Sequence, residues 1–179
     1  MDDTALDTGL RIRELERLGP GDIAALSHLL AECIEGGASV GFVLPATREK
    51  METFWGRVDA TLARGARRLL VAQDASDEIV GAVQLVDPSS ENQPHRADVA
   101  KMLVRPSARR RGVGGALLHA VEALAKRHGK TLLVLDTATP EADRLYRRHG
   151  WQLVGEVPGY ALFPDGSPCA TRFYYKKLA

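Results

Sequence analysis

A loop rich in arginine and glycine, residues 104–118, carries the strongest chemical signal in this sequence. An apolar run ends near Pro106, four arginines lie on either side of that proline, and closely spaced glycines then open a segment with helical apolar periodicity. Glycine lets backbone N–H groups approach an anion, a helix N-terminus adds partial positive charge, and arginine donates charge-assisted hydrogen bonds to phosphate. The segment therefore predicts a phosphate-binding loop between a strand and a helix.

Local spacing separates three kinds of glycine-rich phosphate loop. A P-loop needs Gly-Lys followed by Ser or Thr, but here Ala116 follows the glycine pair. A dinucleotide fingerprint needs a small residue at the place of Leu117 and expects its glycines directly after the strand. The third pattern, Arg/Gln-x-x-Gly-x-Gly/Ala, is filled by Arg109, Gly112 and Gly114. The spacing favours this third pattern and leaves the dinucleotide site as the weaker alternative.

Composition and charge narrow the class of protein. A chain of 179 residues suits one domain with its own core. Its 24 Lys and Arg nearly balance its 23 Asp and Glu, so no overall field attracts nucleic acid or an anionic membrane. No apolar run reaches the roughly 18 residues of a membrane span, and Cys33 and Cys169 lack the spacing of a metal site. We predict a cytoplasmic protein with no metal and no nucleic-acid or membrane partner.

The apolar pattern predicts an α/β domain over residues 10–179, preceded by a disordered tail of residues 1–9. We expect strands at 10–15, 68–72, 79–86, 96–105, 131–137, 151–157 and 171–177, and helices at 20–35, 47–64, 112–128 and 141–149. Because a helix joins the fourth strand to the fifth, these two strands should be parallel. The last two strands should close the sheet as an antiparallel pair linked by a loop over 158–170.

The arginine and glycine loop, with its preceding Leu103-x-x-Pro106, resembles the pyrophosphate loop of the GNAT superfamily of acyl-CoA-dependent N-acyltransferases. The order of elements is also similar to that superfamily's sheet. Further blocks resemble the subfamily of the tabtoxin resistance proteins, namely 36–42, 104–109, 135–137, 155–160 and 164–166. The resemblance implies a GNAT fold, a mixed sheet of about seven strands with about four helices, in which the parallel fourth and fifth strands splay apart.

The same resemblance implies that acyl-CoA lies between the splayed strands. Unpaired backbone groups of the fourth strand could bind the acyl carbonyl and the pantetheine amides, and loop amides could bind the pyrophosphate. The residues expected at this donor site are Met102, Leu103, Val104, Arg109, Arg110, Arg111, Gly112, Val113, Gly114 and Gly115. For each of the three loop arginines the alternative is that it simply faces water.

Acyl transfer requires a neutral amine, although a free alkylamine has a pKa of about 10, so a base is useful. Asp136 closes the fifth strand at its carboxyl end, where open α/β sheets place ligands. Asp98 shares strand parity with Met102 and Val104 unless a bulge shifts the register. Each carboxylate has a structural alternative, an ion pair for Asp98 and a helix cap for Asp136.

Tyr146, within the segment 142–150, occupies the position where the superfamily usually has its tyrosine acid. A hydroxyl with a pKa of about 10 is suited to protonate the departing thiolate; the alternative for Tyr146 is a place in the core. Phe42 and Tyr160 lie in loops expected to border the acceptor pocket, or else they anchor those loops.

The resemblance therefore implies an acetyl-CoA-dependent N-acetyltransferase that acts by direct transfer in a ternary complex. It favours a primary amine of a small molecule, amino-acid-like or antibiotic-like, as the acceptor, which would suit a role in antibiotic resistance. A protein or peptide acceptor stays open as an alternative, as does a non-catalytic acyl-CoA-binding module. Both a monomer and a homodimer are compatible with these expectations.

Overall fold

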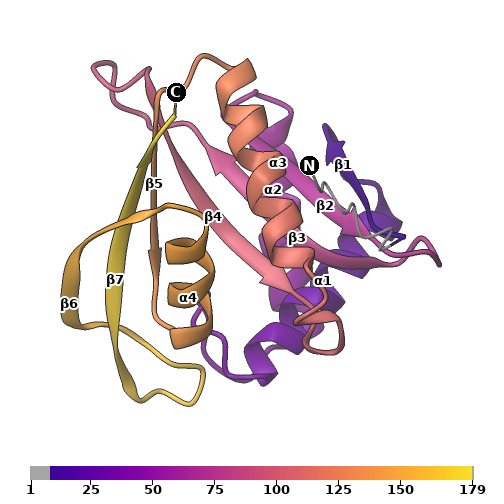
Figure 1. The fold of residues 1–179 in the computed structure, drawn as a ribbon. Helices are drawn as coiled ribbons and strands as arrows, with labels where there is room; N and C mark the ends of the chain where they lie inside the picture. Colours follow the sequence, from indigo (N-terminus) through magenta and orange to yellow (C-terminus); the bar gives the residue numbers. More distant parts are fainter. Residues whose placement is uncertain (1–8, 179) are drawn as a thin grey trace.

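A single mixed sheet with helices on both faces forms the body of the protein (Figure 1). The computed structural model describes residues 9–178, so the tail expected at residues 1–9 lies almost wholly outside the described residues. The elements are β1 (Arg11–Leu15), α1 (Pro20–Glu35), α2 (Arg48–Leu62), β2 (Arg67–Gln73), β3 (Ile79–Val86), β4 (Arg96–Val104), α3 (Val113–Arg127), β5 (Leu132–Thr137), α4 (Pro140–Arg148), β6 (Gln152–Leu162) and β7 (Pro168–Lys177). No helix in this part of the chain is long and apolar enough to cross a membrane.

The sheet has the strand order β1-β2-β3-β4-β5-β7-β6, and every neighbouring pair is antiparallel except β4 with β5. Those two strands are parallel because α3 crosses between them. Their ladder is short, since only Arg96–Asp98 pairs with Leu132–Val134. The predicted α/β architecture, with its parallel and splayed fourth and fifth strands, is confirmed.

A β-bulge marks the point where β4 leaves β5. Ala100 lies opposite Gln84 of β3, whereas Leu103 lies opposite Ala82, so β4 contains one residue more than its partner over this interval. Lys101 at the bulge has a φ of 50°, in the left-handed region that a lysine rarely adopts. An extra residue bends a strand and inverts the alternation of its side chains.

That inversion places the side chains of β4 on unexpected faces. Val99 belongs to the core beneath α3 and α4, and Met102 and Val104 pack against the same core beyond the bulge, whereas Leu103 belongs to the core beneath α1 and α2. Asp98, next to Val99, therefore lies on the α1/α2 face. The expectation that Asp98 shares a face with Met102 and Val104 is wrong, because the bulge changes the parity between them.

The closing hairpin is longer than predicted. β6 continues to Leu162 and β7 begins at Pro168, so the expected loop over 158–170 is mostly strand. The pairing is irregular around Pro158, where Gly159 has a φ of 63°. A proline is compatible with a strand at the edge of a sheet or at a bulge, and β6 offers both conditions. The edge position of β6 follows from the topology and not from the local sequence.

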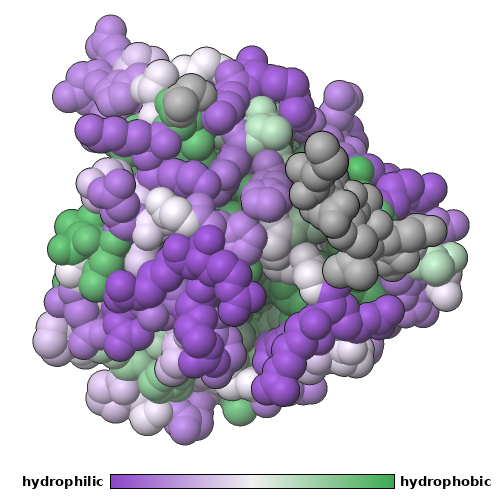
Figure 2. Space-filling model, in the orientation of Figure 1, coloured by the Kyte–Doolittle hydropathy of each residue, from purple (hydrophilic) through white to green (hydrophobic). Residues whose placement is uncertain are grey.

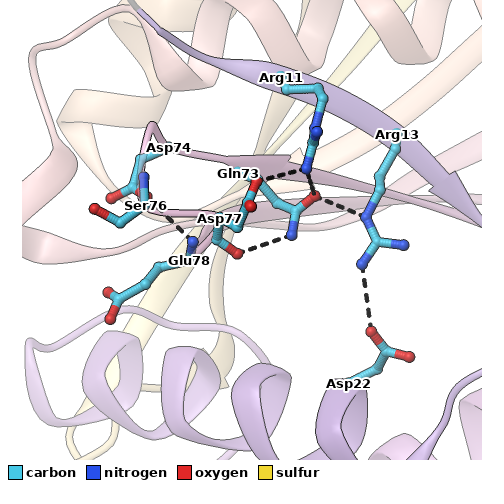
Figure 3. Close-up of polar contacts among 8 residues, drawn as sticks. All are labelled: Arg11, Arg13, Asp22, Gln73, Asp74, Ser76, Asp77 and Glu78. Carbon is cyan, nitrogen blue, oxygen red and sulfur yellow. Dashed lines mark hydrogen bonds and ion pairs between the residues drawn. The ribbon is translucent and has the colours of Figure 1, made fainter.

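A closed polar network fixes β1 to the β2–β3 hairpin and to α1 (Figure 3). The buried Gln73 accepts hydrogen bonds from Arg11 at 3.2 Å and Arg13 at 2.8 Å, and its Nε2 donates to the backbone oxygen of Asp77 at 2.8 Å. Arg11 also pairs with Asp77 at 2.6 Å, and Arg13 with Asp22 at 3.5 Å. Both polar ends of the glutamine and both arginines have partners, as in a purely structural network.

Candidate active site

The arginine and glycine loop has the backbone form of an anion site. Gly112, at the start of α3, has a φ of 82° and open space around a hypothetical Cβ, so its conformation rather than crowding favours glycine. Arg110 is also left-handed, with a φ of 62°. Left-handed residues among right-handed ones turn successive N–H groups toward a common concavity. The first amide with a helical acceptor is that of Ala116, which donates to Gly112 at 3.0 Å, so amides 113–115 have no partner within the helix.

Gly114 and Gly115 have a second reason to be glycine. A Cβ on Gly114 would lie 3.2 Å from Leu145, and one on Gly115 would lie 3.1 Å from Nε2 of His149. These glycines therefore let α3 approach α4 closely. Their amides still belong to the first turn of α3, so the packing role adds to the role predicted for their backbone.

The three loop arginines are exposed, and they differ in their contacts. Arg109 donates from Nε to the carbonyl of Val104 at 3.4 Å, which ties the loop to the end of β4. The guanidinium groups of Arg110 and Arg111 have no hydrogen-bond or ion-pair partner between residues 9 and 178. Two positive side chains beside a concave set of amides provide a strongly anion-attracting surface.

The open interval between β4 and β5 adjoins this loop. Beyond Asp98 the edge of β4 that faces β5 has no strand partner, and it includes residues 102–104. Figure 2 shows a recess with hydrophobic residues at its floor between α4 and the N-terminal end of α3. An unpaired strand edge can bind the amides of an extended ligand. The edge and the loop together fit the pantetheine and pyrophosphate parts of acyl-CoA.

Tyr146 is a buried side chain on α4, within the core of the α3/α4 face. Its ring centroid lies 5.9 Å from that of Trp151 and 6.0 Å from that of Tyr174. The hydroxyl of Tyr174 donates to Asp143, whereas the hydroxyl of Tyr146 has no hydrogen-bond partner in the described part of the chain. Burial strongly raises the pKa of Tyr146, and the charge of Asp136 adds to this effect. Tyr146 is therefore protonated at neutral pH and able to donate.

Asp136 lies at the carboxyl end of β5, opposite Phe173 of β7 and on the α1/α2 face. The structural alternative predicted for it does not hold, because the side-chain oxygen of Thr139 caps α4 by accepting a hydrogen bond from the amide of Ala142 at 3.3 Å. Solvent reaches Asp136, yet the surrounding protein raises the pKa of its carboxyl. Lys101 opposes this rise and Asp98 adds to it. A carboxylate with a raised pKa is a stronger base than an ordinary one.

Asp98 forms the ion pair that was the structural alternative predicted for it. Both of its carboxylate oxygens accept hydrogen bonds from Nη1 of Arg96 at 2.9 Å. It shares the α1/α2 face with Asp136, and its charge raises the pKa of the Asp136 carboxyl. The structure thus brings the two predicted carboxylates to one face, with only Asp136 lacking an ion-pair partner between residues 9 and 178.

Three polar residues that the sequence analysis did not select lie on this same face. The ammonium of Lys101 lies 5.7 Å from the ring centroid of Phe54 and 3.5 Å from a hypothetical Cβ on Gly41. Arg67 of β2 donates from Nη1 to the side-chain oxygen of Gln84 on β3. These residues come from separate strands, so no local spacing connects them. The one available signal was Lys101 itself, a charge between the apolar residues of the second half of β4.

Phe42 and Tyr160 border the face from opposite sides. Phe42 packs edge to face against Phe54 of α2, with ring centroids 5.3 Å apart, and Tyr160 packs in the same way against Phe173, also at 5.3 Å. Phe54 is the ring beneath Lys101, and Phe173 is the neighbour of Asp136. Both predicted pocket residues therefore contact residues that adjoin the candidate site.

The loop over residues 36–45 is tied to the β6–β7 hairpin. The amide of Leu44 donates to the carbonyl of Pro164 at 2.9 Å, and the hydroxyl of Ser39 donates to the carbonyl of Leu162 at 3.4 Å. The Ser39 hydroxyl also lies 3.5 Å from Sγ of Cys169, which is a buried free thiol. These contacts join two segments across the α1/α2 face. Residues 9–178 hold no cluster of three or more potential metal ligands.

Comparisons with known proteins point to one family. The acetyltransferase (GNAT) domain family matches residues 65–153, from just before β2 into β6. A protein of Azospirillum brasilense described as an uncharacterized N-acetyltransferase in the hisH-hisA intergenic region is 31% identical over 131 residues, which cover 72% of this chain and 76% of that relative. The chain belongs to the GNAT acetyltransferase family. It is an acyl-CoA-dependent N-acetyltransferase.

Solved structures share the fold of this GNAT enzyme at low sequence identity. The yncA protein of Salmonella typhimurium, solved with acetyl-CoA as its cofactor, has a TM-score of 0.75 and 18% identity over 96% of this chain and 95% of its own. A ribosomal-protein-alanine N-acetyltransferase of Brucella melitensis has a TM-score of 0.75 and 20% identity over 94% of this chain and 99% of its own. At these identities the likeness concerns the fold alone.

Proposed function

We propose that this enzyme transfers the acetyl group of acetyl-CoA directly to a primary amine of a small molecule. One observation carries the proposal. Asp136 lies on the α1/α2 face at the carboxyl end of β5, where β4 and β5 have separated, and Tyr146 lies on the α3/α4 face, close enough for the charge of Asp136 to raise its pKa. An acid and a base on either side of an open strand pair suit a reaction in which two substrates meet in that opening.

On the donor side the protein acts mainly through its main chain. The amides of residues 110–115, with Arg110 and Arg111, bind the pyrophosphate, and the open edge of β4 at residues 102–104 aligns the pantetheine arm. Acetyl-CoA, when bound there, supplies the thioester. Val113 begins the helix whose N-terminal partial charge favours this anion.

On the acceptor side Asp136 takes a proton from the incoming ammonium, directly or through water. The neutral nitrogen then forms a bond to the acetyl carbon while the bond from that carbon to sulfur breaks, and Tyr146 donates its proton to the departing thiolate. The nitrogen of the new amide loses its second proton, which returns through water to the Tyr146 oxygen. The raised pKa of Asp136 suits a base, and the buried hydroxyl of Tyr146 keeps its proton until negative charge develops beside it. Asp98 acts as a fixed charge that tunes Asp136 rather than as a second base.

The covered acceptor face favours a small molecule over a protein chain. The loop over 36–45 and the β6–β7 hairpin are hydrogen-bonded to each other across this face, which narrows the space that an extended peptide would need. The resemblance of several blocks to the tabtoxin resistance subfamily supports an amino-acid-like or antibiotic-like acceptor. The Brucella enzyme is named for ribosomal-protein alanine, but it shares only the fold with this chain. Its name is therefore no evidence for a protein acceptor here.

A screen of primary amines with acetyl-CoA, read as release of free thiol, tests this proposal. We expect turnover with small amines, and we expect Asp136→Asn and Tyr146→Phe to retain acetyl-CoA binding in calorimetry while they lose turnover. A protein acetyltransferase would release thiol only with peptides. A non-catalytic binding module would bind acetyl-CoA but would not release thiol, whichever amine is offered.

A further inference from the structure

Two buried glutamines on neighbouring strands differ in their hydrogen bonding: the amide group of one is fully paired and that of the other is not. Gln73 of β2 uses both ends of its amide within the closed network of Figure 3. Gln84 of β3 is 0% exposed; its oxygen accepts from Arg67, but its Nε2 has no partner, and Nε of Arg67 is also buried without one. Buried polar atoms are nearly always hydrogen-bonded in native proteins, so two unpaired donors side by side indicate a missing acceptor.

The cations at this place also lack counter-ions. Neither Arg67 nor Lys101 forms an ion pair with any residue between 9 and 178, whereas Arg13, in the comparable position beside Gln73, pairs with Asp22. Burial lowers the pKa of the Lys101 ammonium and the charge of Arg67 lowers it further, so the two cations lie close enough to repel each other. A partly buried pair of like charges is unfavourable unless an anion joins it.

The backbone supports the same interpretation. Lys101 has a φ of 50°, an unfavourable conformation for a lysine, and this conformation belongs to the bulge that directs its side chain to the α1/α2 face. Strained residues persist where a functional arrangement requires them. The other charged pair on the face, Arg96 with Asp98, is neutral as a unit. The carboxylate left for the two cations is that of Asp136, which interacts with Lys101 without forming an ion pair.

We propose that Arg67, Gln84 and Lys101 form a subsite for an anionic group of the acceptor. The acceptor is then an amine that also carries a carboxylate, with its ammonium at Asp136 and its carboxylate at the two cations and the free amide N–H of Gln84. This assignment rests on the proposed function and deepens it. It explains why three donors from three strands converge on a place where the protein supplies no acceptor.

The test uses matched acceptors that differ only in the anion. A panel of α-amino acids and the corresponding α-amino carboxamides is offered with acetyl-CoA, and kcat and KM are measured by thiol release. We expect the free acids to have a kcat/KM roughly tenfold or more above that of the carboxamides, mainly through KM, because a buried charge-assisted interaction is lost in the amides. A preference for the carboxamides would overturn the proposal.

The variants Arg67→Met and Lys101→Met should abolish this preference by weakening the acids alone, when each is assayed at a pH above the acid limb of its rate profile, where the effect of Lys101 on the pKa of Asp136 no longer changes the rate. The matched control is Arg13→Met, which removes an arginine from the equivalent glutamine network at the far end of the sheet and should keep the preference. An equal loss for acids and carboxamides in Lys101→Met would assign Lys101 to general catalysis or folding and would contradict an anion subsite.

Thermal unfolding provides a readout that does not depend on turnover. A cation without a counter-ion adds little to stability, so Lys101→Met should unfold at the same temperature as the wild type or higher, whereas Arg13→Met should unfold at a lower one. A lower unfolding temperature for Lys101→Met would show a structural role and overturn the proposal. If acetyl-CoA binds but neither acceptor series reacts, the proposed function fails, and this stability comparison still decides whether the cations are held for a ligand.

Discussion

The two sides of the β4–β5 opening are built from different parts of the polypeptide. The proposed donor side consists of main-chain groups, in the form of loop amides, a helix N-terminus and an open strand edge, all between residues 99 and 115. The proposed acceptor side consists of side chains from β2, β3, β4 and β5, covered by a loop and a hairpin. A common donor can be bound by a backbone shape that tolerates many side chains, whereas a particular acceptor needs particular side chains.

Because of this difference, the two sides should respond differently to amino-acid substitution. Main-chain donors are lost only when the backbone conformation changes or when a new side chain enters the concavity. Side-chain donors can be removed singly, and each removal changes selectivity before it changes the fold. The comparison therefore predicts that donor-side variants lose binding, whereas acceptor-side variants lose preference or proton transfer.

The largest effect is expected from Gly112→Asp on the donor side. The new carboxylate enters the concavity and repels the pyrophosphate, so the affinity for acetyl-CoA should fall by roughly a hundredfold or more in calorimetry. Gly112→Asn separates charge from size, because asparagine has nearly the same volume and tolerates a positive φ. Gly129→Asp adds the same charge at a glycine with a φ of 71° at the other end of α3 and should bind normally. Unchanged affinity in Gly112→Asp would remove the loop from the donor site.

Tyr146→Phe should give the next largest effect, on the chemical step alone. Its ring keeps the contacts with Trp151 and Tyr174 while the proton donor is lost, so single-turnover rates should fall by roughly a hundredfold with acetyl-CoA affinity unchanged. Tyr174→Phe is the matched control, because it removes a buried hydroxyl that is bound to Asp143. That control should cost about 1 kcal/mol of stability and leave the rate unchanged. A Tyr146→Phe enzyme with the wild-type single-turnover rate would exclude the acid role.

The same difference, between main-chain groups of one segment and side chains of separate strands, explains how far each side could be predicted from the sequence. The donor loop was predicted because its arginines, proline and glycines are contiguous, and their spacing encodes a backbone shape. Asp136 was predicted because ligands gather at the carboxyl ends of parallel strands. The residues of the proposed anion subsite, Lys101, Arg67 and Gln84, could not be selected from the sequence because they meet only through the sheet topology. The parity argument for Asp98 failed on one extra residue, since a bulge has no reliable signature in a single sequence.

A smaller effect is expected where the donor loop also serves packing. In Gly114→Ala the new methyl group meets a terminal methyl of Leu145 on α4 at 3.2 Å, so this side chain must give way by a few tenths of an ångström. Acetyl-CoA affinity should fall only a few-fold, with a modest loss of stability. Gly56→Ala in α2 is the control, since nothing lies within 4 Å of its Cβ and the change should stabilise the protein by about 0.5–1 kcal/mol. A loss of affinity as large as that of Gly112→Asp would mean that packing, not loop shape, positions the amides.

The smallest expected effect lies on the acceptor side, in the titration of Asp136. Its carboxyl pKa is raised by burial and by Asp98 and lowered by Lys101, and its charge in turn raises the pKa of the neutral Tyr146 on α4. Removing the cation in Lys101→Met should move this pKa further up, because the ionised form loses its attraction. Removing the anion in Asp98→Asn should move it down, because the ionised form loses a repulsion.

The carboxyl carbon resonance of Asp136 in enzyme labelled with carbon-13 aspartate measures these two shifts directly, with Asp136→Asn to assign the signal. The sign for activity follows from the proton balance, since the base is ionised only above its pKa. With one acceptor throughout, the acid limb of the rate profile should therefore move to higher pH in Lys101→Met and to lower pH in Asp98→Asn. Shifts in the same direction in both variants would mean that a structural change, and not the field of these side chains, governs Asp136.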